Sequence, residues 1–185
     1  FPSWKEKCHQ NHQLILSENA PVIIAQSYRM DTSPSFECRV ENCSLTGDFI
    51  ADLKTLLINL LENVPMDNKV YILGELPKPS STEFLQCLKK NAILSTSIEC
   101  ETSGVPLDYV EKINTALSAV ASRFSNVEFI DLSALLCDRG RCEYLEAGKS
   151  YFYVDGEHLS GYGSEYIWKK VISIIEHKAK DIATR

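Results

Sequence analysis

The sequence predicts an α/β fold, a three-layer sandwich in which helices cover both faces of a central parallel sheet. Short continuous apolar runs alternate along the chain with longer segments whose apolar residues repeat at helical spacing. Continuous apolar runs, unlike alternating ones, are typical of strands buried on both faces of a parallel sheet. With 185 residues the chain is long enough for one such domain, and we predict a single domain over residues 1–185.

The first half of the chain contains two predicted strands with a helix between them. Residues 22–25 form the first apolar run, and residues 70–74 form the second, which ends at Gly74. Thr46 or Asp48 can cap the start of the intervening helix. The apolar residues of that helix recur at helical spacing and are Phe49, Ile50, Leu53, Leu56, Leu57, Leu60 and Leu61.

The second half contains three predicted helices and one clear strand. A short helix is expected near residues 81–90, and a longer one opens near Pro106, a residue type favoured in the first helical turn. Residues 127–130 form the third strand, and residues 151–154 form a short extended piece. The last helix is expected from about residue 160 to about residue 180, with Ser160 as its N-cap.

Composition and charge exclude two function classes. The chain has 44% hydrophobic and 24% charged residues, as an ordinary globular protein does. Its net charge is −6 and it has no cluster of Lys and Arg, so nucleic acid is not an expected partner. No apolar run approaches the length of about 20 residues that a membrane-spanning helix needs.

The seven cysteines indicate an oxidising compartment, because six of them fall into three close pairs in turn-rich segments. Zinc ligands or free thiols are the alternative, but the chain has no CxxC motif and its histidines are scattered. We therefore predict disulfides, with no metal and no cofactor. The pairs are Cys38 with Cys43, Cys87 with Cys100, and Cys137 with Cys142, which leaves Cys8 over.

The run Asp155-Gly156-Glu157-His158 is the candidate catalytic feature. It places a carboxylate three residues before a histidine, in a loop just ahead of the last helix. A carboxylate beside an imidazole can orient the ring and stabilise its protonated form, so that the histidine serves as a general base. A structural hydrogen bond between the two side chains is the alternative. The aromatic residues just before the pair, and the apolar helix after it, favour an anchored functional loop.

These residues carry a family resemblance. The stretch Val127–Ile167 resembles the end of an SGNH hydrolase-type domain, and more closely the C-terminal SGNH domain of multipass membrane O-acyltransferases. Residues 22–29 and 70–77 resemble the middle strands of that family. The matching motifs are Phe129-Ile130-Asp131, Cys137 with Cys142, Tyr153-Val154-Asp155, His158-Leu159-Ser160 and Gly163.

The resemblance implies a flavodoxin-like SGNH fold in which His158 is the general base and Asp155 its orienting carboxylate. The nucleophile of the family is a serine in a Gly-Asp-Ser turn after the first strand, and this sequence contains no Gly-Asp-Ser. Gly47-Asp48-Phe49 has phenylalanine in the serine position, and we interpret Asp48 as a helix cap. The Gly-x-Asn-Asp block is also missing, and Gln26-Ser27-Tyr28 stands roughly in its place.

We therefore expect the chain to lack the first strand and the nucleophile turn, and to be inactive alone. The resemblance implies O-acyl transfer, often of acetyl groups, to or from a carbohydrate or another hydroxyl-bearing acceptor. It also implies a multipass membrane region in the same polypeptide, with this domain on the extracellular or lumenal side. A stand-alone secreted SGNH esterase and a non-catalytic binding domain that kept the fold are the alternatives. Asp131, at the end of a strand, is expected to cap the following turn.

Overall fold

The computed structural model describes residues 20–25, 46–79, 82–94, 100, 107–138, 141–142, 144–146, 150–154 and 158–183. The chain divides into two compact units. The first, here called the sheet unit, comprises Phe1–Glu75 and Lys112–Ile130, and the second, the C-terminal unit, comprises Leu76–Glu111 and Asp131–Arg185. The single domain over residues 1–185 stays a prediction.

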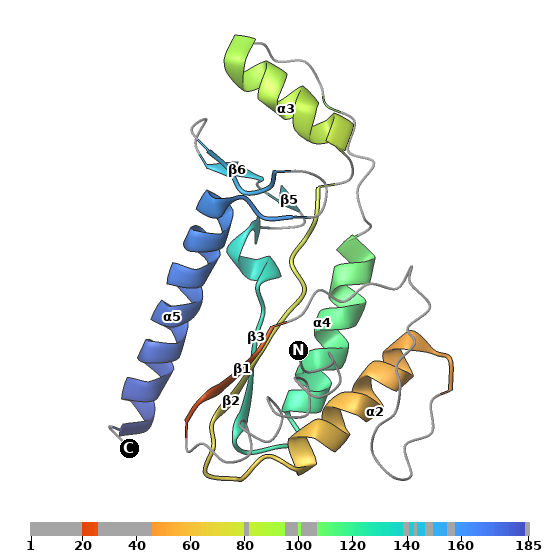
Figure 1. Cartoon of the computed structure of the whole chain (residues 1–185), viewed down its shortest axis with the longest axis vertical. Coiled ribbons are helices and arrows are strands. Elements are labelled where there is room, and N and C mark those ends of the chain that lie inside the picture. Colours follow the sequence, from red (N-terminus) through yellow and green to blue (C-terminus); the bar gives the residue numbers. More distant parts are fainter. Residues whose placement is uncertain are drawn as a thin grey trace, which may run out of the picture. The chain divides into compact units, whose positions relative to one another are not determined.

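A parallel three-stranded sheet forms the centre of the sheet unit (Figure 1). The strands β1 (Val22–Ile24), β2 (Val70–Leu73) and β3 (Val127–Ile130) lie in that order. Val70 of β2 is in register with Val22 on one side and with Val127 on the other. The predicted α/β class and the parallel sheet are thereby confirmed.

Burial differs between the strands, and one expectation was wrong. Every residue of β2 is buried, with Val70 and Ile72 completely inaccessible to solvent. The residues of β1 are only half-buried, although their continuous apolar run predicted burial on both faces. Among the described strands β2 lies between two neighbours, whereas β1 is at an edge. Hydrophobicity alone does not distinguish these two positions.

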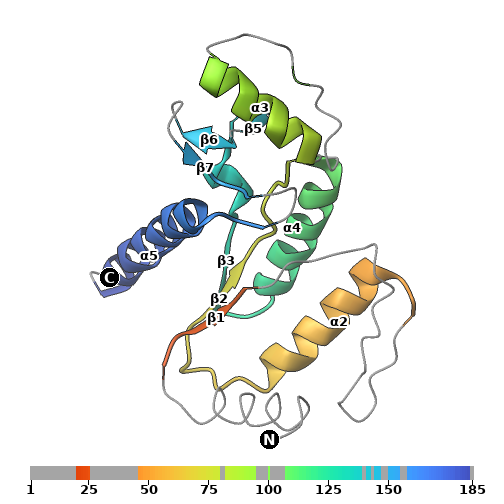
Figure 2. The same ribbon diagram turned by 45° about the horizontal axis from the view of Figure 1, so that its top comes forward.

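Two helices cover one side of the sheet within this unit (Figures 1 and 2). They are α2 (Phe49–Glu62) and the part of α4 (Leu107–Ala121) from Lys112 onward. Burial of one Leu or Ile side chain contributes about 1.5–3 kcal/mol to the free energy of unfolding. The apolar stripes of these two helices therefore supply a large share of the stability of the core. The buried apolar residues of the stripes are Leu53, Leu57, Leu61, Ile113, Ala116, Leu117, Val120 and Ala121.

The start of α2 confirms Asp48 as a helix cap. Its Oδ1 accepts a hydrogen bond from the backbone N–H of Ala51 at 2.8 Å. The next carboxylate, Asp52, accepts three hydrogen bonds, from the backbone N–H of Thr46 (2.7 Å), the Thr46 hydroxyl (2.9 Å) and the N–H of Gly47 (2.9 Å). Gly47-Asp48-Phe49 is therefore a helix-capping turn, in which Gly47 has a φ of 84° that favours glycine.

We expect the Asp52→Asn substitution to destabilise the fold in a pH-dependent manner. The N–H of Thr46 lowers the pKa of Asp52, because it donates to the ionised carboxylate. This contribution is present above the pKa of the unfolded chain, about 4, and is lost as the pH falls through the lowered pKa. The melting temperature of the variant should lie below that of the wild type at pH 7.

The gap between the two melting temperatures should narrow as the pH falls below about 4 and close once the pH is below the lowered pKa of Asp52, where both states bind the proton. Thermal unfolding followed by circular dichroism across pH 2–7 measures it. Asp48→Asn is the matched control, since asparagine is an equally good N-cap and should change little. A gap for Asp52→Asn that does not vary with pH would contradict the argument.

The C-terminal unit consists of helices and short hairpins. Helix α3 (Thr82–Leu94) extends beyond its predicted end because no Gly or Pro interrupts residues 91–94. Helix α5 (Gly161–Ala183) has the predicted extent to within a few residues. The remaining elements are the 3₁₀ turn η1 (Ser133–Leu135) and the antiparallel pairs β4 (Cys137–Asp138) with β5 (Arg141–Cys142) and β6 (Leu145–Glu146) with β7 (Ser150–Tyr151).

Two of the three predicted disulfides are confirmed. Cys87 is bonded to Cys100, and Cys137 is bonded to Cys142 across the β4–β5 pair. Cys8, Cys38 and Cys43 lie outside the described residues. Over the same described part of the chain, no cluster of His, Cys, Asp or Glu is suited to a metal ion. Its helices also include none with the length and apolar character that crossing a bilayer requires.

Candidate active site

His158 lies in a segment that is hydrogen-bonded to the residues shortly before it in the sequence. Residues 152–154 and 158–160 are here called the base loop. The N–H of Val154 donates to the carbonyl of His158 at 2.9 Å, and the N–H of Ser160 donates to the carbonyl of Phe152 at 2.7 Å. Tyr153 and Leu159 form an antiparallel bridge between these bonds. Residues 152–154 and 158–160 are therefore joined backbone to backbone.

Helix α5 begins directly at the end of the base loop. The Oγ of Ser160 accepts a hydrogen bond from the N–H of Gly163 at 2.9 Å, and the carbonyl of Ser160 accepts the first helical bond from Ser164. The prediction that Ser160 is the N-cap is confirmed. A cap at this position fixes the orientation in which the chain passes from His158 into the helix.

Gly163 is required by the close approach of the base loop to α5. A Cβ atom at this position would lie 2.1 Å from the carbonyl oxygen of Phe152 and 2.8 Å from its carbonyl carbon. Since these are main-chain atoms, no rotamer change can make room. The same carbonyl accepts the N–H of Ser160, so the first turn of α5 and the start of the base loop pack backbone to backbone.

Phe152 anchors the loop on the side chains of α5. It is buried, with an exposed fraction of 3%. Its ring stacks with Tyr162 at a centroid distance of 5.9 Å and contacts Tyr166 at 4.8 Å. Tyr162 and Tyr166 are themselves half-buried, as expected for residues at the rim of a core. Aromatic pairs of this kind contribute about 0.5–1.5 kcal/mol beyond their buried area.

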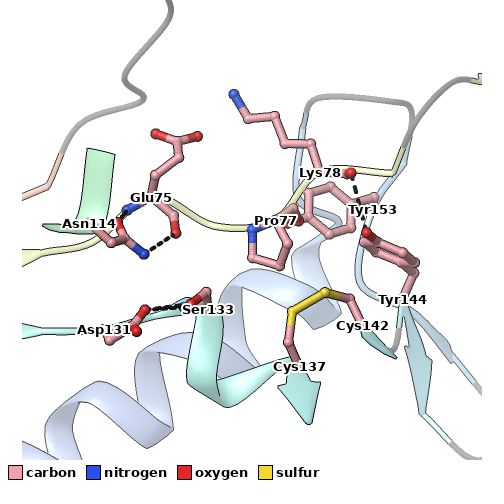
Figure 3. The surroundings of a disulfide bond; sticks show 10 residues. All are labelled: Glu75, Pro77, Lys78, Asn114, Asp131, Ser133, Cys137, Cys142, Tyr144 and Tyr153. Atoms are coloured by element: carbon pink, nitrogen blue, oxygen red, sulfur yellow. Dashed lines mark hydrogen bonds between the residues drawn. A yellow bond between two sulfur atoms is a disulfide. The ribbon is translucent and has the colours of Figure 1, made fainter. Parts of the chain in front are cut away.

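Tyr153 anchors the loop on a different segment. Its hydroxyl donates a 2.6 Å hydrogen bond to the carbonyl of Pro77, and its exposed fraction is 1% (Figure 3). The neighbouring Tyr144 donates to the next carbonyl, that of Lys78, at 3.3 Å. The two tyrosine rings meet edge to face at 6.0 Å, and burial raises the pKa of Tyr144.

His158 is exposed at the surface of the C-terminal unit, as an imidazole must be if it exchanges a proton with a substrate. Its backbone carbonyl is the acceptor that closes the base loop. Asp155 lies outside the described residues, so the catalytic roles of Asp155 and His158 stay predictions. Gln26-Ser27-Tyr28 also lies outside them.

In the sheet unit, the end of β2 is held by a residue that the sequence did not single out. The Oδ1 of Asn114 accepts the N–H of Glu75 at 2.7 Å, and its Nδ2 donates to the carbonyl of Glu75 at 3.2 Å (Figure 3). Gly74 permits this contact, because a Cβ there would lie 2.9 Å from that same Oδ1. A buried polar residue within the apolar stripe of α4, between Val110 and Leu117, was the available signal.

Asp131 has the structural role that was expected. Its Oδ1 accepts hydrogen bonds from the N–H of Ser133 at 2.9 Å and from the hydroxyl of Ser133 at 2.6 Å. These bonds cap the turn that leads into η1. Asp131 is therefore a turn-stabilising residue of the C-terminal unit.

Comparison with known proteins identifies the family. A family model described as "SGNH domain (fused to AT3 domains)" matches residues 2–172. The chain belongs to this family. The fold of this SGNH domain also matches the periplasmic domain of the lipopolysaccharide acetyltransferase of Salmonella ser. Paratyphi A, with a TM-score of 0.50 and 18% identity. At this identity the likeness establishes the fold alone.

The SGNH domain spans about half the length of the solved structures it matches. The alignment with the Salmonella domain covers 69% of this chain and 49% of that one. A protein from Streptococcus pneumonia whose name refers to platelet activating factor matches with a TM-score of 0.44 and 21% identity, over 68% of this chain and 50% of that one. No curated protein matches this chain.

Proposed function

We propose that this SGNH domain belongs to a membrane O-acyltransferase and transfers acyl groups, often acetyl, to or from a carbohydrate or another hydroxyl-bearing acceptor. Membership of a family of SGNH domains fused to AT3 domains supports the acyltransferase context. The observation that supports the chemistry is the hydrogen bond from the N–H of Val154 to the carbonyl of His158, which restrains the backbone at His158. A general base needs such a fixed position, because proton transfer requires hydrogen-bond distances in the reacting complex.

The proposed reaction proceeds in two steps of nucleophilic catalysis. His158 removes the proton of a serine hydroxyl as that oxygen attacks the acyl carbonyl, and Asp155 orients the ring and stabilises the imidazolium. His158 then gives the proton to the departing alkoxide, which leaves an acyl-serine. In the second step it deprotonates the acceptor hydroxyl, which attacks the acyl-serine, and the imidazolium returns that proton to the departing serine oxygen.

In this scheme the serine comes from outside the 185 residues, since they contain no Gly-Asp-Ser turn. We infer that the same polypeptide carries an AT3 membrane region, and that the SGNH domain faces the extracellular or lumenal side. The two disulfides of the C-terminal unit support this location, because disulfides persist in oxidising compartments.

The isolated chain should therefore show no esterase activity, whereas the complete polypeptide should be active. Removing any member of a catalytic triad lowers the rate by roughly four orders of magnitude or more. Hydrolysis of p-nitrophenyl acetate and labelling by a fluorophosphonate probe measure the difference between the two. Stoichiometric labelling of the 185-residue chain would contradict the proposal. A complete polypeptide that neither labels nor turns over would instead indicate a non-catalytic binding domain.

A further inference from the structure

The hydroxyl of Tyr153 connects the base loop to a segment that is distant in the sequence. This residue lies two positions before Asp155, and its backbone pairs with Leu159, the residue after His158. Its hydroxyl bonds to the carbonyl of Pro77, a residue 76 positions away in the sequence. A restraint on Tyr153 therefore acts on both parts of the base loop, residues 152–154 directly and residues 158–160 through the pairing with Leu159.

The segment whose carbonyls accept these hydrogen bonds, residues 77–79, is well suited to hold the hydroxyl in place. Pro77 and Pro79 are both fully buried, and the proline ring restricts the backbone at each of them. The carbonyl of Lys78, between them, receives the hydroxyl of Tyr144 (Figure 3). The Tyr153 bond is the shorter of the two, 2.6 Å against 3.3 Å, and it alone originates in the base loop.

A buried hydroxyl is needed here for more than packing. A phenylalanine ring could make the same edge-to-face contact with Tyr144. It could not donate to Pro77, whose carbonyl lies in a fully buried residue. The hydroxyl therefore supplies a directional restraint on the loop that the ring does not supply.

We propose that Tyr153 is a positioning residue for acyl transfer, whose bond to Pro77 holds the backbone that carries His158. This inference rests on the proposed function. The base acts only when it reaches the proton it removes, and misplacement of a reacting group by about 1 Å can lower the rate about 100-fold. Loss of the hydrogen bond between Tyr153 and Pro77 should therefore slow the chemical step more than it weakens binding of the hydroxyl-bearing acceptor.

The test uses Tyr153→Phe in the complete polypeptide, with Tyr144→Phe as the matched control. Each variant removes one phenolic hydroxyl that bonds to a carbonyl of the same segment, but only Tyr153 belongs to the base loop. Acyl transfer to a soluble hydroxyl acceptor is measured as kcat and KM. The concentration of active sites is measured by burst titration with p-nitrophenyl acetate. The kcat is then calculated per active site, so a smaller yield of folded protein does not lower it.

For Tyr153→Phe we expect kcat to fall about 10- to 100-fold, with KM within about two-fold of the wild-type value. For Tyr144→Phe we expect both constants to stay within about two-fold. An unchanged kcat in Tyr153→Phe, or an equal loss in both variants, would overturn the positioning role. A His158→Ala variant as active as the wild type, or an inactive wild-type polypeptide, would overturn the proposed function and this inference together.

Discussion

Replacing His158 with alanine in the complete polypeptide should lower kcat for acyl transfer by roughly four to six orders of magnitude. The loss of the general base leaves the serine hydroxyl without a proton acceptor, and triad members fail as a unit when one is removed. Alanine keeps the backbone carbonyl that accepts the N–H of Val154. The base loop should therefore stay closed, and the defect should be chemical.

The matched control for this prediction is His177→Ala. His177 is a second exposed histidine of the C-terminal unit, on α5, and has no proposed role in the reaction. Its removal should leave kcat within about two-fold, and neither substitution should change the free energy of unfolding by more than about 0.5 kcal/mol, as is usual for exposed positions. Retention of more than a tenth of wild-type activity in His158→Ala would exclude His158 as the general base.

Gly163→Ala should disrupt the base loop and destabilise the protein, although it adds only one methyl group. The added Cβ would collide with main-chain atoms of Phe152 at 2.1 and 2.8 Å. Overpacking of this kind lowers the free energy of unfolding by about 1–3 kcal/mol, and more where the backbone must move. If the loop shifts to make room, kcat should also fall, about 100-fold for a displacement near 1 Å.

Gly161→Ala provides the control, two residues earlier in the same helix. A Cβ at Gly161 would meet no atom within 4 Å. Alanine is favoured over glycine in helices, so this variant should be as stable as the wild type or up to about 1 kcal/mol more stable. Urea unfolding of both variants, together with kcat in the complete polypeptide, tests the argument. Equal stability of the two variants would show that the contact with Phe152 is not a tight one.

Most of the secondary structure could be predicted from the sequence, because it follows from local patterns. Apolar spacing identified helices α2, α4 and α5, and continuous apolar runs identified the three strands of the parallel sheet. Asp48 and Ser160 were recognisable as caps, since a cap bonds to a residue only three positions away. The two confirmed disulfides were also predictable, because each joins cysteines that are close in the sequence, with separations of 13 and 5 residues.

The candidate site was predictable only in part. The Asp155–His158 spacing and the family motif are local features, and they identified the pair without its surroundings. The half-burial of β1 could not be predicted, because it depends on the order of strands in the sheet. Asn114 was missed for a similar reason, since its partner Glu75 is 39 residues away.

The sequence by itself determined which elements form, where the helices are capped, and which residues are candidates for the chemistry. Only the tertiary structure showed which contacts the base loop makes. The hydroxyl of Tyr153 bonds to Pro77 across 76 residues, and Gly163 is required by the carbonyl of Phe152. Apolar periodicity specifies which face of an element is buried, but it does not specify the partner that each buried polar group or close backbone contact will have.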